Sequence, residues 1–213
     1  AIQVEIRYEA GEQQVYLNGK NVSKEIRQEA VGNMASKVAT KQAVRDKLLD
    51  LQRNLAKEKE AVYRDMCRKD KVNTVLAPGA IEFLDFLTEN NIPHTIATMS
   101  EKDNVDFFIE EFQLAKWFDL DKIVYADGTI PGKPAPDIYI KASQNLNLNP
   151  QDCIVVEDAV SGIESARSAN IGKIIAIASM ESVDLYKNIP AVTQIIKNFD
   201  EIDRNIFEIP CVK

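Results

Sequence analysis

Apolar and polar positions alternate strictly at the start of the chain. One face of residues 2–8 is apolar and the other is polar, and residues 14–17 repeat the alternation after a turn at residues 10–12. A period of two is typical of a strand with one buried face, and the Asn18–Gly19 pair marks a second tight turn. The pattern therefore predicts a half-exposed antiparallel hairpin over residues 2–18.

From Val22 onward the apolar positions recur every three or four residues, which is the helical period. No glycine or proline occurs between Asn33 and Ala77. A single apolar stripe on one long helix is formed by Val44, Leu48, Leu51, Leu55, Val62 and Met66. The stripe is interrupted at the charged run of residues 57–60. This run is the only point in the region where the composition of the chain changes.

After Pro78–Gly79 the pattern changes to helices alternating with short apolar runs. Helices are predicted at residues 80–87, 102–113, 136–146 and 161–169, strands at 94–100, 153–156 and 173–178, and a further helix, strand and helix at 184–204. An apolar run also ends at Tyr125. Such alternation predicts an α/β fold with a doubly wound, Rossmann-like parallel sheet.

Composition and charge narrow the class of protein. Of the 213 residues 45% are hydrophobic and 28% charged, as in ordinary globular proteins, and the net charge is −7. The acidic excess lies in residues 71–213, which argues against nucleic acid as a partner. No apolar run is long enough for a membrane span and no signal peptide opens the sequence. Cys67, Cys153 and Cys211 are expected to be reduced thiols, so we expect a cytoplasmic protein.

Candidate chemistry is concentrated between Gly132 and Gly162. Lys133 lies in a loop stiffened by Pro134 and Pro136, and the apolar run 153–156 ends in Glu157 and Asp158. Ligands of α/β proteins bind at the carboxyl ends of the strands. Two carboxylates beside a fixed ammonium suit Mg²⁺ and a phosphate, although a solvated loop and a strand-terminal turn would give the same pattern.

Three of these features occur in a characteristic order. Thr98 ends a strand, Lys133 follows in Gly-Lys-Pro-Ala-Pro-Asp, and Glu157–Asp158 follow an apolar strand. Together they resemble successive motifs of the haloacid dehalogenase (HAD) superfamily, in particular its β-phosphoglucomutase-like phosphatases and phosphomutases, over about residues 59–205. The resemblance implies that Thr98 hydrogen-bonds the phosphoryl oxygens, that Lys133 neutralises negative charge, and that Glu157 and Asp158 hold Mg²⁺.

One motif of that family is absent from this sequence. The family opens with an apolar strand ending in Asp-x-Asp, which supplies the nucleophile and lies between the Thr98 and Glu157 strands. The only Asp-x-Asp here is Asp119–Leu–Asp121, which follows the Thr98 motif and has no buried strand before it. We therefore interpret it as structural. Without the missing strand, the sheet should contain a central gap unless another strand fills it.

Residues 1–58 resemble a different protein, the nucleotide-monophosphate-binding part of bacterial cytidylate kinase. The resemblance lies in Val15–Arg27, Val31–Val38 and Ala43–Arg53. It implies that Ser36 and Arg45 contact the base of CMP, although both residues could equally be ordinary helix-surface positions. No Gly-x-x-x-x-Gly-Lys-Ser/Thr is present, so transfer from ATP is not expected.

These observations predict four regions: a kinase-like segment at 1–58 in the place of a cap, a joining helix at 59–75, a HAD-like core at 76–205 and a tail at 206–213. We expect a Mg²⁺-dependent phosphoryl-transfer domain for a small phosphorylated, sugar-like metabolite, inactive or impaired without the nucleophile motif. The alternatives are a non-catalytic phosphate- or CMP-binding module and a chimeric or truncated chain. His94, the only histidine, is expected to be structural.

Overall fold

The computed structural model describes residues 3–179 and 181–207, in two compact units, Ala1–Val62 and Tyr63–Lys213. The boundary between the units falls within one continuous helix. Several predictions made from the sequence, those for Ile2, Cys211 and the tail beyond Phe207, lie outside the described residues. Among the described helices, none combines the length and the apolarity that crossing a bilayer requires.

Unit 1 opens with the predicted hairpin. Strands β1 (Val4–Glu9) and β2 (Glu12–Leu17) pair antiparallel, and β2 pairs with the short β3 (Lys20–Asn21). The first turn places Ala10 and Gly11 at φ of 51° and 81°, the left-handed geometry that matches the twist of a two-residue hairpin. The hairpin is confirmed within the described residues, and β3 extends it to three strands.

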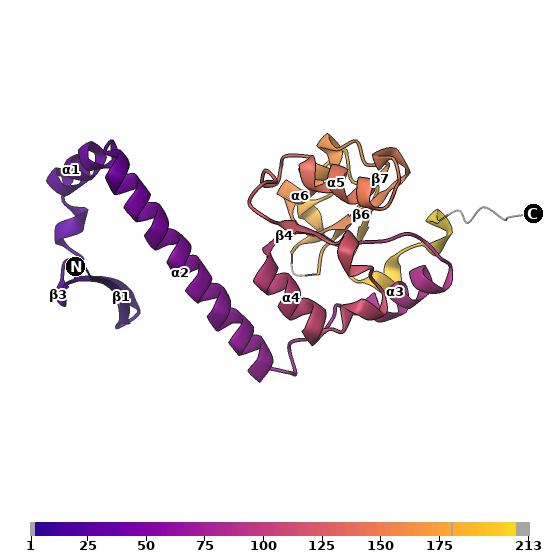
Figure 1. Cartoon of the computed structure of the whole chain (residues 1–213), viewed down its shortest axis with the longest axis horizontal. Coiled ribbons are helices and arrows are strands. Elements are labelled where there is room, and N and C mark those ends of the chain that lie inside the picture. Colours follow the sequence, from indigo (N-terminus) through magenta and orange to yellow (C-terminus); the bar gives the residue numbers. More distant parts are fainter. Residues whose placement is uncertain (1–2, 180, 208–213) are drawn as a thin grey trace, which may run out of the picture. The chain divides into compact units, whose positions relative to one another are not determined.

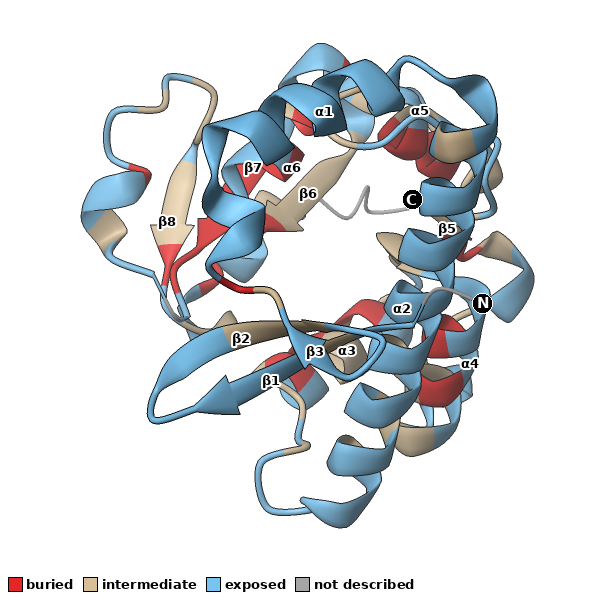
Figure 2. Ribbon diagram, turned by 90° about the vertical axis from the view of Figure 1, so that its left-hand side faces the viewer, coloured by how far each residue is buried: buried red, intermediate tan, exposed pale blue. Residues whose placement is uncertain are grey.

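The rest of unit 1 is mostly helical, and its helices carry no buried residue. A 3-10 turn (Glu25–Arg27) leads into α1 (Glu29–Ala39) and then into α2 (Gln42–Lys69), the long helix that the apolar stripe predicted. No residue of either helix is buried, and Leu55 and Val62 of the stripe are 62% and 58% exposed. In Figure 2 both helices are drawn mostly in pale blue, the colour of exposed residues. The described residues of unit 1 thus form regular secondary structure without a buried hydrophobic core.

The last two turns of α2 belong to unit 2 and pack on α4 (Lys102–Glu111). The Tyr63 ring meets Phe108 edge-on at 6.5 Å between centroids, and the Arg64 guanidinium donates to Asn104 Oδ1 at 2.5 Å. The helix ends at Lys69, where Asp70 accepts from the backbone and side chain of Asn73. The predicted joining helix is therefore too long, because residues 70–75 turn instead of continuing it.

Unit 2 contains the alternating helices and strands that the sequence predicted. Its elements are α3 (Ala80–Glu89), β4 (Ala97–Glu101), α4, β5 (Val124–Ala126), α5 (Asp137–Asn145), β6 (Ile154–Glu157), α6 (Val160–Ser168), β7 (Lys173–Ile177) and β8 (Gln194–Ile196). Figure 1 labels most of these elements. Two details differ from the prediction. Strand β4 begins at Ala97 and not at residue 94, and the two helices expected around β8 are short 3-10 turns.

The parallel sheet of unit 2 is divided into two parts. Strand β4 pairs only with β5, whereas β6, β7 and β8 form a separate three-stranded parallel sheet. A cavity of 1310 Å³ is lined by residues of both β4 and β6. The gap expected at the centre of the sheet is therefore present among the described residues, and none of their strands fills it.

Strand β7 is buried on both faces and organises two cores. Ile174 and Ala176 pack with α5 and α6 on one face, whereas Ile175 and Ile177 pack with α3 on the other. This alternation follows the two-residue period of a strand. The two cores hold the carboxyl end of β6 at a fixed place between them, which is where the candidate site lies.

Candidate functional site

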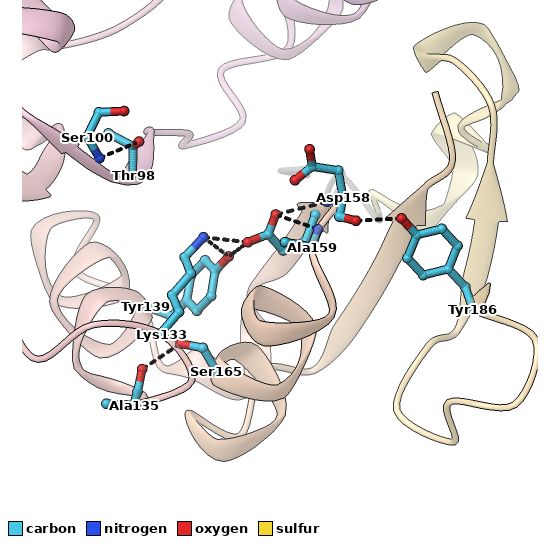
Figure 3. Close-up of polar contacts among 10 residues, drawn as sticks. Thr98, Ser100, Lys133, Ala135, Tyr139, Asp158, Ala159, Ser165 and Tyr186 are labelled. Carbon is cyan, nitrogen blue, oxygen red and sulfur yellow. Dashed lines mark hydrogen bonds and ion pairs between the residues drawn. The ribbon is translucent and has the colours of Figure 1, made fainter. Parts of the chain in front are cut away.

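The centre of the site is an ion pair between the loop lysine and the last residue of β6. The Lys133 ammonium pairs with Glu157 Oε1 and also donates to the Tyr139 hydroxyl oxygen at 3.1 Å. The Tyr139 hydroxyl in turn donates to Glu157 Oε1 at 3.1 Å. The Lys133 and Glu157 side chains are only 16% and 9% exposed. Figure 3 shows Lys133 and Tyr139 side by side, with dashed lines from both to the same carboxylate.

The loop that carries Lys133 is held by α6. The Ser165 hydroxyl is completely buried and donates to the Ala135 carbonyl at 2.6 Å. The Lys133–Pro134 peptide bond is cis. The hydrogen bond from Ser165 to Ala135 ties the loop that carries Lys133 to α6.

Asp158 follows Glu157 and presents its carboxylate outward. Its backbone N–H donates to Glu157 Oε2 at 2.9 Å, and the buried Tyr186 hydroxyl donates to its backbone carbonyl. These two bonds fix the main chain and leave the Asp158 side chain pointing away from the ion pair, as Figure 3 shows. Of the two predicted metal-binding carboxylates, only Asp158 is available to a ligand from solvent.

The protonation of the site follows from burial and from the ion pair. Burial opposes ionisation of Glu157, but the hydrogen bond and charge of Lys133 outweigh it and hold the pKa of Glu157 below its usual value. Partial burial and the adjacent Glu157 carboxylate raise the pKa of Asp158. Burial, reinforced by Glu157, also raises the pKa of the Tyr139 hydroxyl, which therefore stays protonated and able to donate.

Thr98 lies on β4, in the other part of the sheet. Its Oγ1 accepts from the Ser100 N–H at 3.1 Å, which leaves its hydroxyl proton free to donate to a ligand. Figure 3 shows Thr98 and Ser100 apart from the Lys133 ion pair. Thr98, Lys133 and Glu157 nevertheless line the same cavity, so all three can face one occupant.

The two residues predicted to contact CMP belong to unit 1. Ser36 is an exposed residue of α1. The Arg45 guanidinium donates to the Ala39 and Thr40 carbonyls at 3.2 and 3.3 Å and to Gln42 Oε1 at 2.6 Å. Arg45 therefore caps the carboxyl end of α1, and its role as a nucleotide contact stays a prediction.

Two residues interpreted as structural have structural contacts. His94 donates from Nδ1 to the Ile92 carbonyl at 2.7 Å and packs edge-on against Phe118. Asp119 accepts from the Asp121 N–H at 3.3 Å and so caps the 3-10 turn Leu120–Lys122. The Asp-x-Asp sequence at 119–121 therefore forms a local turn at the surface.

The side chains of the site do not form a Mg²⁺ site by themselves. Glu157 does not fit as a ligand, because Oε1 is occupied by Lys133 and Tyr139 and Oε2 by the Asp158 N–H. Asp158 fits a hard cation, but Mg²⁺ requires near-octahedral oxygen coordination. Within residues 3–179 and 181–207, no group of three acidic, histidine or cysteine side chains could hold a metal.

Three residues of the site were not singled out from the sequence. Tyr139 and Tyr186 hold Glu157 and Asp158 by their hydroxyls, and Gly162 leaves room for the Glu157 carboxylate, which a Cβ there would overlap. Gly162 follows Glu157 by five residues, at the start of a helix that the sequence predicts. A glycine there is the one signal that could have indicated a close approach.

Comparison with known proteins shows which family this chain resembles. A family model described as haloacid dehalogenase-like hydrolase matches residues 3–170, so the match extends upstream of residue 59 into unit 1. The crystal structure of a HAD hydrolase (family IA, variant 3) from Entamoeba histolytica is 36% identical. The match covers 88% of this chain and 82% of that one, with a TM-score of 0.68.

Two further relatives have more specific descriptions. The phosphorylated carbohydrates phosphatase of Thermotoga maritima is 29% identical over 134 residues, covering 63% of this chain and 58% of that protein. A β-phosphoglucomutase structure from Clostridium difficile is 25% identical with a TM-score of 0.57, covering 72% of this chain and 63% of that one. The chain spans about half the length of the curated relatives it matches.

Proposed function

Because this chain belongs to the haloacid dehalogenase-like hydrolase family, we propose that it carries the phosphate-binding part of a phosphoryl-transfer site for a small phosphorylated, sugar-like metabolite. The observation that carries the proposal is the Lys133 ammonium, held almost out of water by Glu157 and Tyr139 at the carboxyl end of β6. The names of the Thermotoga maritima phosphatase and the Clostridium difficile β-phosphoglucomutase support the class of substrate.

Lys133 would bind the phosphate as a fixed positive charge. An ammonium has three N–H donors, and two of those of Lys133 are used by Glu157 and Tyr139. The third remains for a phosphoryl oxygen. Thr98 would supply a second, neutral donor from β4, since its hydroxyl proton is not used by Ser100. A dianionic phosphate between these donors is stabilised more strongly at a water-poor site than at a solvated surface.

Mg²⁺ is the cofactor that enzymes of this family generally use, and when bound it would stabilise phosphoryl charge. Asp158 is the residue we propose for it. Because Glu157 is committed to Lys133, the remaining ligands must come from the substrate, from water or from groups beyond the described residues. Asp158→Asn should weaken Mg²⁺ binding measured by isothermal titration, whereas Asp152→Asn, at an exposed site before β6, should not.

The nucleophile motif is absent from this sequence, so we expect the 213-residue chain to hydrolyse phosphate esters slowly or not at all. Losing a nucleophile that acts together with its partners typically removes several orders of magnitude of rate. The test is hydrolysis of p-nitrophenyl phosphate with and without Mg²⁺. Turnover that disappears in Asp158→Asn would contradict the expectation and indicate an unconventional nucleophile.

Binding can be tested separately from turnover. Titration with inorganic phosphate should give saturable heat that Lys133→Met reduces at least about tenfold, because the charge in contact with the anion is lost. Lys141→Met is the matched control, since Lys141 is an exposed lysine of α5 paired with Asp127 at 3.4 Å. Equal binding by the two variants would contradict the role of Lys133. A parallel titration with CMP, repeated with Arg45→Ala, tests the nucleotide site predicted in unit 1.

A further inference from the structure

The cavity between β4 and β6 has two open strand edges facing each other. The Val124 N–H of β5 donates to the Ile96 carbonyl at 2.8 Å, so Ile96 presents its backbone groups to β5. Backbone groups of successive strand residues point to opposite edges. Ala97 therefore presents its N–H and carbonyl to the edge of β4 away from β5, where no described strand pairs with it.

Strand β6 has the same arrangement on its side of the cavity. The Lys173 N–H of β7 donates to the Cys153 carbonyl at 3.3 Å, so Cys153 and Val155 present their backbone groups to β7. Ile154 and Val156 consequently present theirs to the opposite edge. Among the described residues, no strand pairs with β6 along that edge. All three edge residues, Ala97, Ile154 and Val156, line the cavity.

The lining and the size of the cavity limit what can occupy it. Most lining side chains are apolar, among them Phe83, Val105 and Phe108. The volume of 1310 Å³ exceeds the roughly 300–1,000 Å³ of small-molecule sites. A small apolar molecule would also leave the backbone groups of both edges unpaired, and unpaired backbone groups shielded from water are strongly unfavourable. An extended peptide satisfies both edges and the apolar lining together.

From these contacts we infer that the cavity is a strand-acceptor site, which binds an apolar, proline-free peptide segment as an inserted strand between β4 and β6. The inserted backbone pairs with Ala97 on one side and with Ile154 and Val156 on the other. Its side chains alternate between the α3 and α5 faces of the sheet, and both faces are apolar, so the segment must be apolar on both faces. This inference is independent of the proposed phosphoryl chemistry.

The probe is a synthetic peptide with the sequence of Gly172–Ala178, which contains β7, a strand buried on both faces, with two lysines added at its amino end. Amide hydrogen exchange of the full chain should slow at Ala97, Ile154 and Val156 on binding. The amides of Thr98 and Val155 are the internal controls, because they face β5 and β7 already. No added protection at saturating peptide would overturn the inference.

Two matched peptides separate strand pairing from apolar adsorption. The same peptide with alternate backbone amides methylated keeps its side chains but loses donors to one edge, and should bind about tenfold more weakly. A peptide with the sequence of Gln3–Glu9, which is polar on one face, should not bind. Equal affinity of the methylated peptide would overturn strand pairing. A concentration-dependent dimer that already protects the three amides would assign the cavity to a second copy.

A protein variant tests the same edge from the other side. Ala97→Pro removes an N–H of β4 that faces the cavity and leaves the Ile96 carbonyl free to pair with Val124. It should weaken peptide binding about fivefold, whereas Ala97→Ser should bind like the wild type. Unchanged binding by a folded Ala97→Pro variant would overturn the assignment of this edge. The methylated peptide decides the question if the variant does not fold.

Discussion

Gly162 decides whether the Lys133–Glu157 ion pair can form. A Cβ at position 162 would overlap the Glu157 carboxylate, so Gly162→Ala should push Glu157 away from Lys133 and leave a shielded ammonium unpaired. Removing one partner of a buried pair is strongly destabilising, and we expect a loss of about 3 kcal/mol in the free energy of unfolding. Urea unfolding followed by circular dichroism measures it.

Gly132→Ala is the matched control for this variant. Gly132 precedes Lys133, a Cβ added to it would meet no other atom within 4 Å, and its φ is not positive. Its substitution should change the free energy of unfolding by less than about 0.5 kcal/mol. If Gly162→Ala were as stable as Gly132→Ala, the close approach of Glu157 would not be rigid.

Asp127 provides a prediction on pH dependence at a single residue. The Thr129 hydroxyl and N–H donate to Asp127 Oδ1 at 2.6 and 2.8 Å and lower the pKa of Asp127 to about 2. A pKa that is lower in the folded state adds stability above the unfolded pKa of about 3.9, and this stability is lost as the pH falls through about 2. An NMR titration of the Asp127 carboxyl should give this midpoint.

Thr129→Ala should move the Asp127 midpoint upward, because it removes the side-chain hydrogen bond that contributes most to the lowered pKa. Thr193→Ala is the control, since the Thr193 hydroxyl donates to the Ile174 carbonyl and to no carboxylate. An unchanged midpoint in Thr129→Ala would show that the turn at 127–129 does not hold the carboxylate in solution.

At the scale of elements, the sequence predicts best where burial and periodicity agree. Strand β7, with alternate residues in two cores, and helices α5 and α6 were all predicted from their patterns. Strand β4 was predicted too long because a strand is defined by its neighbours. One edge of β4 has no described neighbour, and its other neighbour, β5, is only three residues long. The pairing with β5 therefore begins at Ala97 and ends at Glu101.

The predicted helices around β8 were wrong because local side-chain caps compete with helix formation. Ser182, Asn198 and Asp203 each accept from the N–H two residues further on, and each starts a 3-10 turn. Such turns satisfy the first backbone donors without a longer helix. Of the helix, strand and helix predicted at residues 184–204, only the strand, β8, is confirmed.

The sequence singled out side chains that lie together, but it did not indicate their contacts. Thr98, Lys133 and Glu157 line one cavity, and their roles in binding stay a prediction. The sequence could not indicate that Glu157 would use both oxygens within the protein, since this depends on Tyr139 and Gly162 from two different helices. Contacts between residues far apart in the chain are set by packing, which periodicity alone does not encode.

At the scale of the whole molecule, helix α2 connects the two units, since the boundary between Val62 and Tyr63 lies within it. None of its residues before Tyr63 is buried, so this part of the helix has no core to stabilise it and depends on helix propensity and on continuity with the two turns that pack on α4. The predicted joining helix is thus part of one continuous helix that crosses the boundary between the units. Interrupting the helix next to the boundary should separate their unfolding.

Ala61→Pro makes that interruption. Proline at a helix interior removes a hydrogen bond and clashes with the preceding turn, which costs about 3 kcal/mol or more. We expect the helical signal at 222 nm to fall and residues 1–62 to unfold at lower temperature, whereas unit 2 keeps its wild-type midpoint because its cores lie far along the chain from residue 61.

Ala61→Gly keeps the N–H and should cause a smaller loss of about 1 kcal/mol. Trp117, which donates to Asp85 at 2.7 Å, reports on unit 2 by fluorescence. A single transition at the wild-type midpoint for Ala61→Pro would show that α2 does not couple the units.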